Sequence, residues 1–246
     1  MKKKMANMLA DIERRVAKAV EAYWQTRKGQ ADKQSSSGKK DQGARSAVTG
    51  GAQMNGFVHL VRDLVIDAGI KEHFLSYNTA LELPGFFRPT KEWDLLVVKN
   101  GQLVLALEAK SQVGPSFGNN FNNRTEEAIG SAVDIWTAYR EGAFNTTIRP
   151  WLGYIFLLED CRESRVPVRV KEPHFPVLPE FKDASYALRY ELFCRKLVRE
   201  RHYNTAAFLL SKREKGIRGQ YTEPAEDLKF EIFVRSLIGH VAAYGG

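Results

Sequence analysis

The sequence predicts an α/β fold in which helices flank a mixed central β-sheet on both faces. Apolar runs of strand length recur along the chain, and amphipathic segments with three- and four-residue apolar spacing stand between them. With 246 residues, of which 43% are hydrophobic, the chain is long enough to bury a substantial core. We therefore expect residues 1–246 to form a single domain.

Composition divides this domain into successive parts. Residues 1–27 predict an N-terminal amphipathic helix, because Ile12, Val16 and Val20 recur on one face. Residues 28–51 are poor in apolar side chains and rich in Lys, Ser, Gly and Gln, which predicts a flexible basic segment. We expect residues 52–160 to form the core that carries the candidate site, and residues 161–246 to form a helical part with a basic loop.

The central part contains the clearest pattern. Residues 93–98 and 103–109 are apolar runs joined through Asn100-Gly101, a strong short-range signal for a β-hairpin. A helix at 54–68 that ends at Gly69 and a strand at 76–83 precede it. After it we expect a polar loop at 114–124, a helix at 125–139, a strand at 151–158 beside the hairpin, a helix at 184–201, an apolar segment at 205–211, a basic loop at 212–220 and a helix at 225–243.

The chain is basic, with 37 Lys and Arg against 29 Asp and Glu, a net charge of +8 and a pI near 9.4. Such a balance favours polyanionic partners, most often nucleic acid, although a basic surface that maintains solubility is the alternative. The segment 28–51 is then either a plain linker or an arm that orders on DNA. Its candidate phosphate contacts are Lys39, Lys40 and Arg45.

Other classes of protein fit poorly. Cys161 and Cys194 have neither the number nor the spacing of a disulfide framework or a zinc site, so we expect reduced thiols. The five histidines show no ligand spacing. Since no stretch has the pattern of a membrane span or a signal peptide, we expect a cytoplasmic protein.

The candidate catalytic residues are Asp94, Glu108 and Lys110, at the edge of the predicted hairpin. Hydrolysis of a phosphodiester needs an attacking water and stabilisation of negative charge, and a divalent metal held by carboxylates beside an ammonium supplies both. Because Mg²⁺ is typically bound by one or two carboxylates plus substrate oxygens, we predict Asp94 and Glu108 as Mg²⁺ ligands. The alternative is that all three are strand-end charges paired in solvent.

Strand geometry makes this prediction conditional. Glu108 and Lys110 lie two residues apart, so their side chains leave the same face of a strand. A regular two-residue turn at Asn100-Gly101 would set Asp94 opposite Leu107 and send it to the other face. A three-residue loop or a β-bulge would set Asp94 opposite Glu108 instead. We therefore predict one of these two irregularities in the hairpin.

The order of Asp94 and Glu108-Ala109-Lys110 resembles the PD-(D/E)XK nuclease superfamily. A closer resemblance, over nearly the whole chain, is to the XhoI-type restriction endonucleases, and it is carried by Asn55-Gly56-Phe57, Leu107-Glu108-Ala109-Lys110-Ser111-Gln112 and the Phe-Gly-Asn-Asn-Phe-Asn-Asn-Arg run at 117–124. The resemblance implies a restriction-endonuclease-like core and a type II enzyme that recognises the palindrome 5′-CTCGAG-3′. It further implies Mg²⁺-dependent cutting of both strands after the first C, leaving 5′ overhangs.

A palindrome in double-stranded DNA is matched by a two-fold homodimer with one site per strand. Arg or Lys suits guanine and Asn or Gln suits adenine, each pairing being worth ~1–3 kcal/mol of discrimination. Two segments offer these residue types, although a simple turn and a solvated basic loop are the alternatives. The candidate DNA-binding residues are Asn119, Asn120, Asn122, Asn123 and Arg124 in the first segment, and Lys212, Arg213, Lys215, Arg218 and Gln220 in the second.

Two other functions stay open. One is a repair or recombination nuclease of the same fold that reads DNA structure rather than sequence. The other is a non-catalytic DNA-binding protein with a structural acidic cluster, against which the intact carboxylate pair argues. A third acidic group at the site would come from Glu72 or Glu82.

Overall fold

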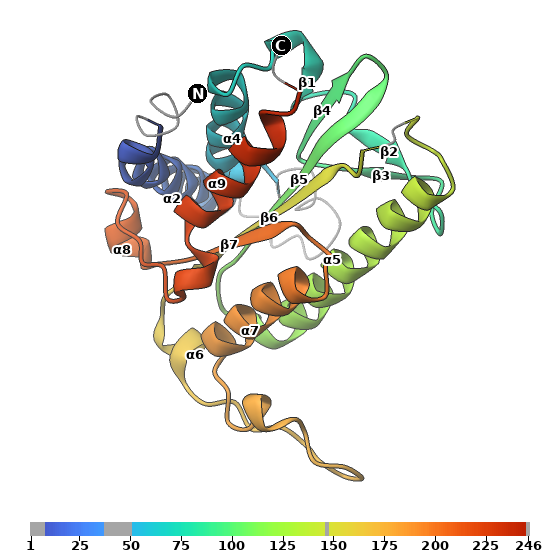
Figure 1. Cartoon of the computed structure of the whole chain (residues 1–246). Helices are drawn as coiled ribbons and strands as arrows, with labels where there is room; N and C mark the ends of the chain where they lie inside the picture. The colour runs from blue at the N-terminus through green and yellow to red at the C-terminus, as the bar shows by residue number, and fades with distance from the viewer. Residues whose placement is uncertain (1–7, 37–50, 146–147, 245–246) are drawn as a thin grey trace.

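The computed structural model describes residues 8–36, 51–145 and 148–244, and it confirms the α/β architecture (Figure 1). A five-stranded sheet has the order β1-β4-β5-β6-β7. β1 pairs with β4 and β4 with β5 in antiparallel fashion, whereas β5, β6 and β7 are parallel, so the sheet is mixed. Its strands are β1 (Leu75–Ser76), β4 (Leu95–Lys99), β5 (Gln102–Gln112), β6 (Trp151–Glu159) and β7 (Thr205–Ser211).

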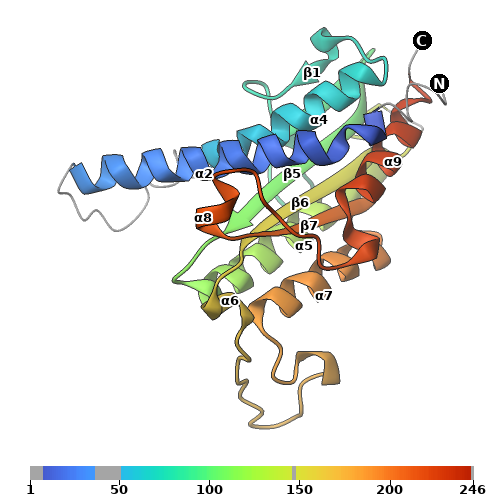
Figure 2. The same cartoon turned by 90° about the vertical axis from the view of Figure 1, so that its left-hand side faces the viewer.

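Helices cover both faces of this sheet (Figures 1 and 2). One face packs against α2 (Ile12–Ser36), α4 (Asn55–Asp67) and α9 (Phe230–Val241), and the other against α5 (Phe117–Arg140) and α7 (Tyr186–Arg199). Every residue of β6 is buried, as expected for a parallel strand with helices on both sides. The buried strand predicted at 151–158 is therefore confirmed, and the apolar segment 205–211 is the buried strand β7.

The N-terminal helix is longer than predicted. Its end at residue 27 was wrong, because α2 continues to Ser36 through part of the segment expected to be flexible. Residues 28–36 contain no proline, and their Lys, Gln and Ala are favourable in helices. The predicted phosphate contacts Lys39, Lys40 and Arg45 lie outside the described residues.

The single strand expected at 76–83 is wrong. β1 ends at Ser76 and belongs to the main sheet, while β2 (Glu82–Pro84) pairs with β3 (Thr90–Glu92) in a separate two-stranded sheet. Ala80 between them has a φ of 56°, a left-handed conformation that cannot continue a strand. The consequence for the site is that β3 approaches β5 from a separate sheet.

Helices α4 and α7 agree with the predicted ranges 54–68 and 184–201 to within two residues at each end. α4 ends where Gly69 adopts a φ of 112°, and α7 falls inside the expected range. α9 begins at Phe230 rather than at 225, because a separate 3-10 turn, Glu226–Leu228, precedes it. The basic loop 212–220 contains a short helix, α8 (Arg213–Gly216).

Between β6 and α7 the chain makes a long excursion that the pattern of apolar residues did not predict. It contains the short helix α6 (Arg162–Arg165) and a 3-10 turn at Pro179–Phe181, and it projects away from the body in Figure 1. None of the helices in the described part of the chain has the length and apolarity needed to cross a membrane.

Candidate active site

The hairpin contains the predicted irregularity, and it is a β-bulge. The turn at Asn100-Gly101 is regular, since Lys99 pairs with Gln102, but the register shifts between Val97 and Val98. Leu95 then pairs with Leu107, and the Asp94 amide donates to the Leu107 carbonyl at 3.0 Å. The register therefore sets Asp94 beside Glu108, on one face of the sheet.

The three predicted catalytic side chains meet at this point. The ammonium of Lys110 lies 3.1 Å from Oε1 of Glu108 and 3.5 Å from Oδ2 of Asp94. The Ala109 amide also donates to Oδ2 of Asp94, at 2.7 Å. The alternative of solvent-exposed strand-end charges does not fit, because the Glu108 side chain is only 3% exposed.

A second lysine, which the sequence did not single out, completes the cluster. Nζ of Lys91, on β3, lies 3.2 Å from Oε2 of Glu108, so each oxygen of this buried carboxylate faces one ammonium. Burial alone would raise the pKa of Glu108, but the two ammonium groups outweigh it and hold that pKa below its usual value. Glu108 is therefore ionised at neutral pH.

The two lysines respond to burial differently. Burial alone would lower the pKa of Lys110, but the carboxylates of Glu108 and Asp94 raise it above its usual value. Burial lowers the pKa of Lys91, and the attraction of Glu108 offsets only part of this. Lys110 is thus the more firmly protonated of the two.

Tyr203 is hydrogen-bonded to the buried carboxylate of the cluster. Its hydroxyl lies 3.3 Å from Oε2 of Glu108 and 3.2 Å from the carbonyl oxygen of Ala128, so one proton is shared between two acceptors. This contact links Glu108 on β5 to helix α5. No local pattern in the sequence indicated Tyr203, which stands 95 positions from Glu108.

Replacing Tyr203 by Phe should therefore loosen Glu108 without leaving a large cavity. We expect the free energy of unfolding to fall by about 1 kcal/mol, the usual net value of one hydrogen bond. The neighbouring Tyr154 is the matched control, since its buried hydroxyl has no hydrogen-bond partner in the described part of the chain. Thermal melting should show no loss for Tyr154→Phe, and equal losses for both variants would contradict this role of Tyr203.

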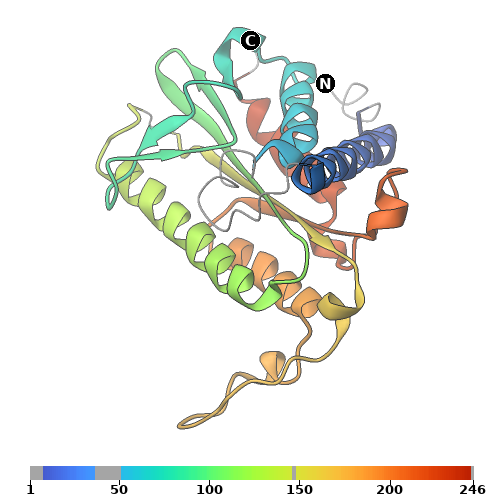
Figure 3. The ribbon, with the colours of Figure 1, turned by 180° about the vertical axis from the view of Figure 1, so that it is seen from behind.

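A cavity of about 460 Å³ opens beside the cluster. Asp94, Lys110 and Arg124 line it together with two further acids, Glu92 and Glu127. Neither Glu72 nor Glu82, the third acids considered from the sequence, is among the lining residues. In Figure 3 the region where β3, β5 and α5 approach one another faces the viewer.

The polar loop predicted at 114–124 is wrong over most of its length, because α5 begins at Phe117 rather than at 125. Phe117 and Phe121 are one turn apart and pack on Tyr186 and Tyr190, which stabilises a helix where Asn and Gly alone would disfavour one. Of the candidate DNA-binding residues there, Arg124 lines the cavity. Asn119, Asn120, Asn122 and Asn123 occupy the first turns of α5 without lining it.

The basic loop stands apart from the cavity. Lys212, Arg213, Lys215, Arg218 and Gln220 are exposed, and none of them lines the cavity. Arg213 pairs with Glu159 at 3.0 Å, at the end of β6. The loop thus follows the same edge of the sheet as the ends of β5 and β6, and its role in DNA binding stays a prediction.

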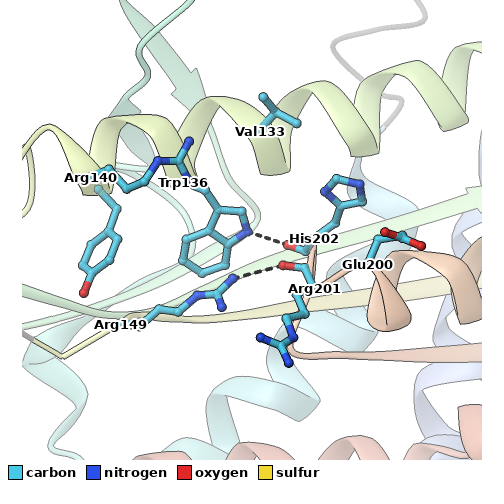
Figure 4. Close-up of a pocket in the computed structure, with 8 residues that line it drawn as sticks. Val133, Trp136, Arg140, Arg149, Glu200, Arg201 and His202 are labelled. Atoms are coloured by element: carbon cyan, nitrogen blue, oxygen red, sulfur yellow. Dashed lines mark hydrogen bonds between the residues drawn. The ribbon is translucent and has the colours of Figure 1, made fainter.

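A second cavity, of about 400 Å³, lies along the C-terminal half of α5 (Figure 4). Its floor is Trp136, with the Arg149 guanidinium 3.9 Å from the ring centre, and Arg140 and Arg201 also line it. Glu200 is the one carboxylate among its lining residues. Three arginines and a single carboxylate among the lining residues do not suit a divalent metal. The cluster of Asp94 and Glu108 therefore remains the candidate metal site.

The cluster suits a divalent cation in both chemistry and position. Asp94 and Glu108 offer hard oxygen donors, which Mg²⁺ prefers. The Lys110 ammonium pairs with both carboxylates, so the two acidic side chains face a common point and attract positive charge there. Asp94 and Glu108 could therefore hold Mg²⁺, with Lys110 beside it.

Comparisons with known proteins identify the family of the chain. The family model described as "Restriction endonuclease XhoI" matches residues 33–223. The chain is 55% identical over 208 residues to type II restriction enzyme BstVI of Geobacillus stearothermophilus, covering 82% of this chain and 93% of that protein.

It is also 46% identical over 198 residues to type II restriction enzyme XhoI of Xanthomonas vasicola, covering 79% of this chain and 78% of that protein. Type II restriction enzyme AbrI of Azospirillum brasilense is 52% identical over 172 residues, which cover 70% of this chain and 77% of that protein. No solved structure matches the chain. From the extent of the family match and of these identities, the chain belongs to the XhoI restriction endonuclease family.

Proposed function

We propose that this chain makes Mg²⁺-dependent double-strand cuts in DNA at the palindrome 5′-CTCGAG-3′, after the first C. As a member of its family it is a type II site-specific deoxyribonuclease. The proposal adds the metal, the target sequence and the assembly. The metal is supported by the bulge in the hairpin, which sets Asp94 and Glu108 on one face with the Lys110 ammonium within 3.5 Å of both. The target sequence is what the resemblance to the XhoI-type enzymes implies.

In this proposal each charged side chain has a separate task. Asp94 and Glu108 would hold Mg²⁺, which when bound activates a water and neutralises charge on the phosphate. Lys110 faces the cavity and would offset the negative charge that develops during cleavage. Tyr203 and the Ala109 amide keep the two carboxylates in position.

The DNA contacts in the proposal come from around the cavity. Arg124 lines the same cavity as Lys110, so its guanidinium would lie near a phosphate bound there. The asparagines on the same helix and the basic loop would extend the contact surface. A palindromic target requires two copies of this site, so the active species would be a homodimer. A cytoplasmic location remains a prediction.

Digestion of a sequenced plasmid that contains two 5′-CTCGAG-3′ sites tests the proposal. With Mg²⁺ we expect two linear fragments with 5′ ends at those sites, and with excess chelator we expect uncut plasmid. Nicks at random positions or cuts only at branched DNA would favour a structure-reading nuclease. Intact plasmid in the presence of Mg²⁺ would contradict the catalytic assignment.

A further inference from the structure

Lys91 lies against the buried end of the active site although it is not one of the predicted catalytic residues. Its side chain is 12% exposed, and Nζ is 3.2 Å from Oε2 of Glu108. The same ammonium lies 4.0 Å from the centre of the Trp93 ring. Because an unpaired ammonium is costly to bury, Glu108 and this ring together explain why Lys91 stays inside.

The charges of the cluster balance. Asp94 and Glu108 are negative, and Lys91 and Lys110, their partners in ion pairs, are positive. Arg124 and Glu127, which also line the cavity, pair with each other at 2.6 Å and together carry no net charge, and Glu92 is exposed. A divalent cation that enters without DNA therefore gains little net attraction from the four charged groups of the cluster.

The protein also offers few ligands. In the described ranges, no group of three or more His, Cys, Asp or Glu side chains could hold a metal ion. Two carboxylates are enough for Mg²⁺ only when waters and substrate phosphate oxygens complete the shell. A phosphate would supply both the missing oxygens and the missing negative charge.

We propose that Lys91 couples metal binding to DNA binding. By neutralising the Oε2 side of Glu108, it keeps the carboxylate pair a weak cation site until a DNA phosphate adds negative charge. This inference rests on the Mg²⁺ site of the proposed function. Lys91 acts through Glu108 as a positioning residue, so its effect is on the affinity for the metal and not only on the rate of cleavage.

The test is calorimetric titration of Ca²⁺ into the DNA-free protein, with Lys91→Met compared with wild type. Met keeps the length of the side chain and packs well on an aromatic ring. We expect Lys91→Met to bind Ca²⁺ at least about tenfold more tightly, because one positive charge is removed beside the ion. An affinity equal to or weaker than that of wild type would overturn the inference.

Lys99→Met is the matched control. Lys99 lies on β4, the next strand along the chain. Its ammonium also faces an aromatic ring, that of Phe74 at 5.9 Å, and it donates to the Tyr244 carbonyl. It stands at the far end of the hairpin from Asp94. Its loss should leave the Ca²⁺ affinity at the wild-type value, and an equal gain in both variants would overturn the specific role of Lys91.

A second measurement starts from the wild-type protein. If DNA completes the cation site, linkage requires Ca²⁺ to tighten the binding of a specific duplex by the same factor as the duplex tightens the binding of Ca²⁺. In wild type a mobility-shift titration should show at least about tenfold tighter DNA binding with Ca²⁺, with the duplex verified as intact. An unchanged DNA affinity would overturn the inference. In folded Lys91→Met the effect of Ca²⁺ on DNA binding should be smaller than in wild type, and an effect of wild-type size would also overturn the inference.

Failure of the underlying metal site would look different. Glu108→Gln should lose the effect of Ca²⁺ on DNA binding whatever the role of Lys91. If Glu108→Gln keeps the full wild-type effect, the Mg²⁺ site of the proposed function is wrong, and this inference falls with it. If only the Lys91→Met result fails, the site stands and the coupling role is wrong.

Discussion

Glu108→Gln should lower the single-turnover rate of Mg²⁺-dependent DNA cleavage by at least about 10³-fold, in line with the loss of a main electrostatic contact at a reacting centre. The change removes the charge of a proposed metal ligand and leaves two ammonium groups facing a neutral amide. The variant should still bind the specific duplex without metal, because it has lost a negative charge that would repel the phosphates of the DNA. Rapid-quench cleavage and mobility shift on the same duplex measure both effects.

Lys110→Met should also slow cleavage, by at least about 10²-fold, while both carboxylates remain. Glu223→Gln is the control, because this half-buried carboxylate accepts the Phe230 amide at the start of α9, in the opposite helix layer. Its rate should match wild type. Cutting at the wild-type rate by both Glu108→Gln and Lys110→Met would rule out the assigned site.

Arg124→Ala should weaken binding of the specific duplex by about 10- to 100-fold, the loss of one good base contact at ~1–3 kcal/mol. Arg124 lines the cavity, and its guanidinium pairs with Glu127 at 2.6 Å one turn along α5. If it reads a base, discrimination against an altered site should fall and the salt dependence should change little. If it contacts phosphate, binding to all sequences should weaken and the salt slope should fall by about one.

Arg235→Ala is the matched control for that experiment. Arg235 forms a comparable helical ion pair with Glu231 at 2.6 Å, but on α9, in the layer away from the cavity. Its removal should leave both affinity and discrimination unchanged. An equal loss in Arg124→Ala and Arg235→Ala would mean that general positive charge, rather than a site contact, determines DNA binding.

The sequence was sufficient to predict the hairpin of β4 and β5, the strand β6 and the convergence of Glu108 and Lys110, because strand periodicity determines which side chains share a face. The same periodicity showed that Asp94 could share a face with Glu108 and Lys110 only if the hairpin contained an irregularity. The sequence did not distinguish a longer turn from a bulge. The extra residue lies within the uniformly apolar run 103–107, where no Gly or Pro indicates it.

The features that the sequence did not reveal depend on long-range packing. The start of α5 at Phe117 depends on contacts of Phe117 and Phe121 with α7, which outweigh the low helix propensity of Asn and Gly. Lys91 reaches Glu108 because β2 and β3 form their own small sheet, and no local period predicts that pairing. Tyr203 meets Glu108 only through the order of the strands.

Asp94, Glu108 and Lys110 are proposed to form one Mg²⁺-dependent cleavage site. End-mapping of a linear duplex with a single 5′-CTCGAG-3′ site tests this directly when the duplex is incubated with Mg²⁺ and either wild type or Glu108→Gln. We expect wild type to cut both strands after the first C and the variant to bind the duplex and leave it intact. Equal cutting by the two proteins would show that Glu108 is not part of the cleavage site.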